Sequence, residues 1–162
     1  DVYIKMISEA KKSIKIATPY LIIEPEIMSA LKIAAKSGVQ VDFLLPGKYD
    51  YLAVGSATRS YYEQLLANGI RIYEYKNTFV HSKILIIDDQ VASVGTVNLD
   101  PRSFHLNFEV TAIFMNKAVI DLVNSFNGDL TKSELILLEE WKKRSIIKRI
   151  IQGWFNLFSP MF

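Results

Sequence analysis

Short apolar runs that alternate with amphipathic helical stripes are the feature that most constrains how this chain folds. Apolar runs predict strands at 13–18, 39–45, 70–75, 83–88, 91–94 and 108–114. Residues spaced three and four apart predict helices at 2–12, 26–37, 51–68 and 117–126, and from Leu135 to near the end. A turn at Asp88-Asp89-Gln90 joins two of these strands into a hairpin. The pattern predicts an α/β domain with a mixed sheet flanked by helices on both faces.

Composition narrows the classes of protein to which the chain can belong. At 162 residues it has the size of one ordinary domain, and half of its residues are hydrophobic. A net charge of +2 is too small to indicate nucleic-acid binding, and the absence of cysteine excludes disulfides and thiolate metal sites. No apolar run reaches the roughly 18 residues that cross a bilayer. Because the chain opens on Asp1 rather than Met, we expect a domain of a longer protein, with a targeting or membrane segment upstream.

His81 and Lys83 form the most reactive pair in the sequence. Alternate residues of an extended segment project to one side, so the imidazole and the ammonium are predicted to lie together, about 6.6 Å apart along the backbone. A neutral imidazole can attack phosphorus, and a fixed cation can hold the oxygens on which negative charge develops. The pair therefore predicts phosphoryl chemistry.

Residues 95–109 add the polar groups that such a site needs. They include, in order, Gly95-Thr96-Val97-Asn98, Arg102-Ser103 and Asn107-Phe108-Glu109. We expect Asn98 to hold phosphate oxygens together with Lys83, and a carboxylate to hydrogen-bond the second ring nitrogen of His81. Asp88 lies an odd number of residues from both His81 and Lys83, so a regular strand points it to the opposite face. Glu109 is therefore the predicted orienting group, and Asp88 a supporting residue.

The combined pattern resembles the HKD motif of the phospholipase D superfamily. The matching elements are His81-x-Lys83-x4-Asp88, Gly95-Thr96-x-Asn98 and Asn107-x-Glu109. In that superfamily one histidine forms a covalent phosphohistidine, and the histidine of a second motif protonates the leaving group. The resemblance implies a catalytic set of His81, Lys83, Asp88 and Glu109, and a phosphate-binding set of Lys83, Thr96 and Asn98. It implies no metal and no other cofactor.

A wider resemblance to the C-terminal half of bacterial cardiolipin synthases covers nearly the whole chain. It rests on Thr18-Pro19-Tyr20, Leu45-Pro46-Gly47-Lys48, Ser60-Tyr61-Tyr62-Glu63, Gly69-Ile70-x-Ile72-Tyr73-Glu74-Tyr75, Asn98-Leu99-Asp100-x-Arg102-Ser103-Phe104-x-Leu106-Asn107-Phe108-Glu109 and Phe158-Ser159-Pro160. Such proteins carry two HKD domains after hydrophobic membrane segments. The resemblance implies a phospholipase D-like fold and phosphatidyl transfer between two phosphatidylglycerol molecules, giving cardiolipin and glycerol.

His105 is the only other histidine, and no lysine follows it two residues later. It is predicted to be a surface residue in a loop rather than the second catalytic histidine. Since one motif cannot supply both nucleophile and acid, the isolated chain is expected to be inactive unless a second HKD domain joins it. That domain would come from the missing N-terminal half or from another copy. Which of the two roles His81 takes stays open.

The C-terminal end is predicted to be an amphipathic, basic, helical tail of residues 133–162 on a phospholipase D-like domain of residues 1–132. From residue 141 onward it has no acid, and its basic residues are Lys142, Lys143, Arg144, Lys148 and Arg149. Its apolar residues at helical spacing are Ile147, Ile150, Ile151, Trp154, Phe155 and Phe158. Two interpretations stay open: such a helix packs on the protein, or lies on an anionic membrane surface.

Five further residues are predicted substrate contacts. Lys48, Tyr49 and Arg59 belong to aromatic stretches that suit a lipid or glycerol pocket, and Arg102 and Ser103 lie inside the motif region.

The leading prediction is the C-terminal catalytic half of a cardiolipin synthase, a transferase of phospholipid biosynthesis at the bacterial cell membrane. The fragment itself is expected to be soluble or peripheral, with no nucleic-acid partner. One alternative is a single-motif phosphodiesterase, such as a nuclease, that builds its site from two chains. The apolar basic tail and the small net charge argue against it. The other alternative is a non-catalytic half-domain that binds membranes.

Overall fold

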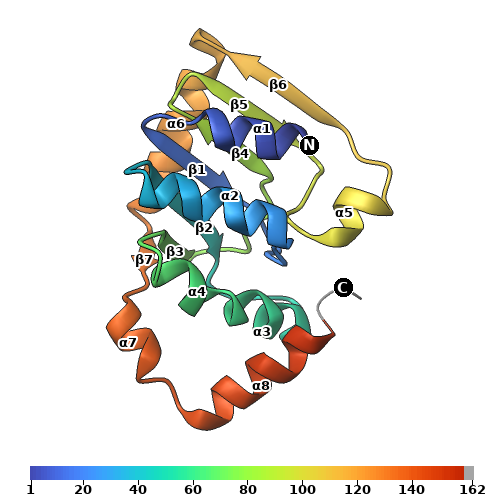
Figure 1. The fold of residues 1–162 in the computed structure, drawn as a ribbon, viewed down its shortest axis with the longest axis vertical. Helices are drawn as coiled ribbons and strands as arrows, with labels where there is room; N and C mark the ends of the chain where they lie inside the picture. The colour runs from blue at the N-terminus through green and yellow to red at the C-terminus, as the bar shows by residue number, and fades with distance from the viewer. Residues whose placement is uncertain (159–162) are drawn as a thin grey trace.

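One mixed sheet runs through the centre of the molecule. A computed structural model describes residues 1–158, so the Ser159-Pro160 part of the predicted resemblance lies outside the described residues. Seven strands lie in the order β6-β5-β4-β1-β2-β3-β7 (Figure 1). Their bounds are β1 Ser13–Ala17, β2 Gln40–Pro46, β3 Arg71–Tyr75, β4 Ile84–Ile87, β5 Val91–Gly95, β6 Thr111–Met115 and β7 Ser133–Leu135.

The pairing of the strands confirms the predicted mixed sheet. The central strand β1 is parallel to β2 on one side and antiparallel to β4 on the other. Strands β2 and β3 are parallel, whereas β3 with β7, β4 with β5 and β5 with β6 are antiparallel. The β4–β5 hairpin turns at Asp88 and Asp89, both with positive φ, as the turn chemistry predicts.

Helices cover both faces of the sheet, as predicted. Their bounds are α1 Val2–Glu9, α2 Pro25–Lys36, α3 Leu52–Ser60, α4 Tyr62–Leu66, α5 Pro101–His105, α6 Lys117–Leu130, α7 Leu138–Lys142 and α8 Ile146–Leu157. Consecutive residues of β2 contact the two layers of helices. Phe43 packs in the core with α1, α2 and α4. Leu44 packs instead with Val119 and Phe126 of α6. Helix α6 lies on the other face of the sheet (Figure 1).

Two predictions for residues 51–105 differ from the structure. The helix expected at 51–68 is two helices, α3 and α4, joined at Tyr61. The break lets Tyr62 turn inward, where it is fully buried and donates a hydrogen bond to Glu74 at 3.0 Å. His105 ends helix α5 rather than lying in a loop, because Asp100 caps that helix by accepting from the backbone N–H of Ser103.

The chain from Leu135 is not helical throughout. Strand β7 comes first and pairs with β3, so the sheet extends three residues past the predicted boundary at 132. Helix α7 follows, and Trp141 at its end packs on Tyr62 with ring centroids 4.9 Å apart. Helix α8 then runs beside α3 (Figure 1). None of the helices within residues 1–158 is both long and apolar enough to cross a membrane.

Candidate active site

His81 and Lys83 lie side by side at the entrance to β4. Both precede the strand, in the extended segment that follows β3, rather than within the predicted strand itself. The ammonium nitrogen of Lys83 lies 3.1 Å from both ring nitrogens of His81 and donates to the His81 carbonyl oxygen at 2.8 Å. The imidazole is exposed, whereas the Lys83 side chain is half-buried. The pair thus presents an accessible imidazole beside a cation held in place by the backbone.

Thr96 and Glu109 form a second group, built where β5 ends and just before β6 begins. The Thr96 hydroxyl donates to one carboxylate oxygen of Glu109, and the Asn107 amide donates to the other at 3.3 Å. The Thr96 hydroxyl is the main cause of a lowered pKa of Glu109, with smaller contributions from Asn107, Ser103 and Lys83. Glu109 is therefore stabilised as a carboxylate within a fixed hydrogen-bond network.

Gly95 explains why this network can form. A Cβ atom at Gly95 would lie 2.2 Å from the carbonyl oxygen of Val110 and 2.7 Å from the Cα of Thr111. Both are backbone atoms, so the two strand ends approach as closely as only glycine permits. The same approach lets Thr96 exchange hydrogen bonds with Val110, at 2.9 and 3.0 Å.

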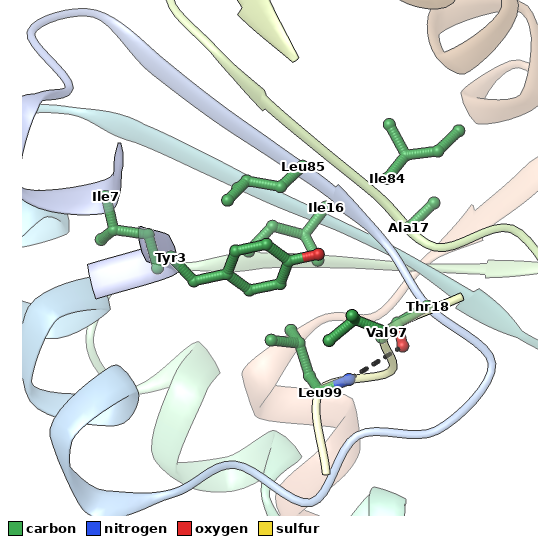
Figure 2. Close-up of a pocket in the computed structure, with 9 residues that line it drawn as sticks. All are labelled: Tyr3, Ile7, Ile16, Ala17, Thr18, Ile84, Leu85, Val97 and Leu99. Atoms are coloured by element: carbon green, nitrogen blue, oxygen red, sulfur yellow. Dashed lines mark hydrogen bonds between the residues drawn. The ribbon is translucent and has the colours of Figure 1, made fainter. Parts of the chain in front are cut away.

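Asn98 is held by its two neighbours. Val97 and Leu99 both line a small apolar cavity between α1 and the sheet (Figure 2). Its volume is about 10 Å³. This space suffices for about one water molecule and not for a substrate. Thr18 lies at its edge and accepts from the backbone N–H of Leu99 at 3.5 Å (Figure 2). Because successive residues of an extended segment point to opposite sides, Asn98 points away from the cavity that Val97 and Leu99 line.

Helix α5 also fixes the segment that contains Asn98. The backbone N–H of Asn98 donates to the Ser103 hydroxyl at 3.1 Å, and Asp100 caps the helix. Among the described residues, no donor reaches the buried amide oxygen of Asn98.

The electrostatics of Lys83 link the two groups. Burial lowers the pKa of the Lys83 ammonium, and the carboxylates of Glu109 and Asp100 act in the opposite direction. These carboxylates are therefore near enough to stabilise the cation. The Thr96–Glu109 network thus lies close enough to Lys83 to act on its charge, and a shared catalytic role of these residues stays a prediction.

The described residues show no hydrogen bond between Glu109 and His81. Glu109 is bonded to Thr96 and Asn107 instead, so its role in orienting His81 stays a prediction.

Asp88 lies at the other end of β4 from His81. Its carboxylate accepts from the backbone N–H groups of Lys11, Lys12 and Ser13 at 2.7–2.9 Å. Burial raises the pKa of Asp88, but these three donors outweigh burial and lower it overall. This placement agrees with the parity argument, which points Asp88 away from His81.

An aromatic cluster beside His81 is the part of the site that sequence reasoning missed. The ring centroid of Phe79 lies 5.8 Å from that of His81, and Phe79 also contacts Tyr20 and Tyr49 at 6.1 and 6.5 Å. The signal was present, because Phe79 lies two residues before His81 and so has the parity that pairs His81 with Lys83. Phe79 is thus an aromatic neighbour of the exposed imidazole.

The predicted substrate contacts have different surroundings. Tyr49 belongs to the aromatic cluster, and the guanidinium of Arg59 lies 5.0 Å from its ring centroid. Arg59 itself donates to Glu74 and to the Gly47 carbonyl, both at 2.9 Å, which uses two of its five N–H donors in the fold. Lys48 and Arg102 are exposed, and Ser103 is buried against the Asn98 backbone.

His105 stands apart from this arrangement. Its Nε2 lies 2.6 Å from a carboxylate oxygen of Glu24, and its side chain is 64% exposed. This placement agrees with the predicted surface residue. Within residues 1–158 no group of three or more His, Asp or Glu side chains is arranged to hold a metal ion.

Comparison with known proteins adds three similarities. A cardiolipin synthase 2 from Bacillus anthracis is 46% identical over 160 residues, which are 98% of this chain and 31% of that protein. The crystal structure of Nuc, a phospholipase D family member from Salmonella typhimurium, superposes with a TM-score of 0.72 at 22% identity, covering 84% of this chain and 89% of Nuc. Phosphatidylserine synthase from Haemophilus influenzae has a TM-score of 0.73 at 13% identity, covering 99% of this chain and 42% of that protein.

The chain therefore spans about a third of the length of its curated relatives, and the two crystal structures share its α/β fold. The family described as "Cardiolipin synthase, PLD-like domain" matches residues 3–130, which include the whole His81, Lys83, Thr96 and Glu109 arrangement. The chain belongs to this family of phospholipase D-like cardiolipin synthase domains.

Proposed function

We propose that this chain is the C-terminal catalytic half of a cardiolipin synthase. The complete enzyme would transfer a phosphatidyl group from one phosphatidylglycerol molecule to another, giving cardiolipin and glycerol. The observation that supports this most is the convergence of His81 and Lys83 with the Thr96–Glu109 network. An imidazole, a fixed cation and hydrogen-bond donors are what transfer at phosphorus requires.

The site residues have separate roles in this proposal. Lys83, Thr96 and Asn98 bind the non-bridging oxygens of the phosphate, where negative charge develops. His81 supplies one of the two histidines, and Glu109 orients it when substrate and the second domain are in place. Asp88 supports the site by fixing the start of β1. Lys48, Tyr49, Arg59, Arg102 and Ser103 are the proposed substrate contacts.

The proposed reaction has two displacement steps. First, a histidine nitrogen attacks the phosphorus of one phosphatidylglycerol, and an N–P bond forms as the P–O bond to glycerol breaks. The second histidine gives its proton to the departing glycerol oxygen. A hydroxyl of the second phosphatidylglycerol then attacks the same phosphorus, passes its proton to that second histidine and displaces the first. Each histidine thus ends as it began.

The second histidine would come from another HKD domain, which we place at the β6 edge of the sheet. This edge strand exposes Ile113 and Met115, and Phe108 and Val110 just before it are also exposed. A cleft of about 650 Å³ opens beside it, lined by parts of α1, α5 and β6. The remaining two thirds of the relatives' length provides a domain to cover this apolar surface.

We also propose that the complete protein is located at the bacterial cell membrane, where its lipid substrates are. Residues 1–132 would be the phospholipase D-like domain and residues 133–162 its basic tail, with β7 completing the sheet.

The test is transfer by the full-length protein, measured as conversion of labelled phosphatidylglycerol to cardiolipin. His81→Ala should lower the rate by about 1,000-fold or more, because the reacting imidazole is removed. His105→Ala is the comparison variant and should lower the rate far less, since His105 is exposed, pairs with Glu24 and lines the cleft beside β6 instead of lying beside Lys83. Transfer that survives His81→Ala would refute the assignment.

Other results would point to the two alternatives. Salt-sensitive DNA cleavage by a dimer of the 162-residue chain would indicate a homodimeric nuclease. Vesicle binding without turnover, even after the missing half is added, would indicate a non-catalytic module.

A further inference from the structure

Helix α8 sits on the protein with its polar side inward. Gln152 is the buried residue of this helix, and its amide oxygen accepts from Arg144 at 3.0 Å. Arg144 also donates to Glu63 of α4 at 2.9 Å and to the Trp141 carbonyl oxygen at 2.8 Å. Arg144 thus joins Gln152 of α8 to Glu63 of α4, and α8 runs beside α3. The attachment therefore uses the side of the helix that normally faces water.

The apolar side of α8 consequently faces outward. Ile146, Ile150 and Trp154 follow one another at four-residue spacing, and Ile147 and Leu157 lie on the same side of the helix. These five side chains are between 61% (Trp154) and 74% (Leu157) exposed. Gln152 follows Ile150 by two residues, which is about 200° around the helix, so the buried and the exposed apolar sides are opposite.

Basic residues border the apolar side. Lys148 and Arg149 are exposed on its two margins, and Lys142 and Lys143 precede the helix. Residues 141–158 contain no Asp or Glu, although Glu139 pairs with Lys142 at 3.6 Å. An apolar side with cations on both margins is the arrangement of a helix that lies in the plane of an anionic lipid surface.

We propose that α8 is a membrane-docking surface that inserts Ile146, Ile147, Ile150, Trp154 and Leu157 into an anionic bilayer. A lipid surface is the occupant that the charge favours, because anionic headgroups complement cations on both margins whatever their detailed arrangement. Figure 1 also shows α8 at one end of the long axis and β6 at the other, so a domain at β6 leaves α8 open. This surface goes beyond the proposed reaction and does not require it.

The test is binding of the 162-residue chain to vesicles, measured by co-sedimentation without any turnover. Phosphatidylcholine vesicles with and without phosphatidylserine are compared, because phosphatidylserine is not a substrate of the proposed reaction. The chain should bind the anionic vesicles more tightly, and added NaCl should weaken this binding. The double variant Ile150→Ser with Trp154→Ser should bind about tenfold more weakly or worse on both vesicles.

Two further variants sharpen the result. Ile33→Ser with Ile120→Ser removes two apolar side chains of comparable exposure, 66% and 53%, from α2 and α6 and should bind like the original chain. Lys148→Glu with Arg149→Glu should lose binding to anionic vesicles and keep the weaker binding to neutral ones. All the substituted residues are exposed, so thermal unfolding should show that the variants fold.

Three outcomes would overturn the proposal. One is that the original chain stays unbound to vesicles. Another is equal binding by the original chain and the Ile150→Ser, Trp154→Ser variant. The third is self-association that this variant abolishes in the absence of lipid, which would make α8 an interface between copies.

Discussion

Asp88 accepts hydrogen bonds from three consecutive backbone N–H groups that precede and begin β1. Its φ of 54° lies in the left-handed region, which aspartate tolerates better than most residues. The left-handed conformation and the negative charge of Asp88 together join the β4–β5 turn to the start of the central strand. At the scale of single residues, one motif therefore contains a reacting pair and a structural acceptor with separate tasks.

Because Glu109 and Asp88 have separate tasks, substitutions of these two carboxylates should have unequal effects. Glu109→Gln should lower the transfer rate by about 100-fold, because the amide no longer provides the negative charge beside Lys83. Asp88→Asn should change the rate much less and instead lower the free energy of unfolding by about 1–2 kcal/mol. Transfer assays and urea unfolding of the full-length variants measure both effects. Equal losses of rate would place Asp88 closer to the reaction than the structure shows.

The lowered pKa of Lys83 should set the alkaline limit of activity. An ammonium binds phosphate only below its pKa, and burial lowers the pKa of Lys83, so the charge is lost at a lower pH than in an exposed lysine. The rate should therefore fall with rising pH before about 10.4, the ordinary lysine value. Lys83→Arg keeps its charge and should move this limit to higher pH. A pH–rate profile with the same alkaline limit in both proteins would contradict the assignment.

At the scale of the elements, the β5–β6 contact depends on Gly95. Gly95→Ala should destabilise the fold by about 2–3 kcal/mol and misplace Thr96, because the added Cβ collides with the backbone of Val110 and Thr111. Gly128→Ala in α6 is the matched control, since nothing lies within 4 Å of its added Cβ. It should stabilise the protein by about 0.5–1 kcal/mol. Thermal unfolding measures both, and an equally mild Gly95→Ala would disprove the close approach.

The elements that were predicted correctly are those whose own sequence determines them. The run Ile84 to Ile87 is apolar throughout and is buried in the sheet between β1 and β5, so its strand was predicted within one residue. Strand β7 was missed because Ser133-Glu134-Leu135 has no buried residue and becomes a strand only by pairing with β3. The break at Tyr61 likewise depends on the distant Glu74, which accepts from Tyr62.

The site likewise contains features that the local sequence determines and features that depend on distant contacts. Parity along the chain correctly placed His81 beside Lys83 and Asp88 away from them. The bond between Thr96 and Glu109 depends on how β5 and β6 approach each other, which spacing in the sequence does not specify.

On the scale of the whole molecule, residues 133–145 tie the C-terminal elements to the sheet. Strand β7 covers β3, Trp141 packs on the fully buried Tyr62, and Arg144 bonds to Glu63. The division at residue 132 therefore has a structural cost that can be measured.

Two truncated chains would measure the stability that residues 133–145 contribute. A chain that ends at residue 132 should lose about 3 kcal/mol of unfolding free energy, because it uncovers Tyr62 and the β3 edge. A chain that ends at residue 145 keeps both contacts and should lose less. Chemical denaturation compares the two, and equal stability of the chains ending at 132 and 145 would show that residues 133–145 are dispensable.

The two edges of the sheet differ in a way that limits how many units can assemble. Strand β7 is only three residues long, and its Glu134 pairs with Lys76 at 3.0 Å, so this edge is short and charged. Strand β6 is longer and apolar on its exposed surface. Short charged edges discourage the addition of further strands. Two such domains that meet through their β6 edges would turn both β7 edges outward, so growth would stop at a closed pair instead of continuing into a fibre.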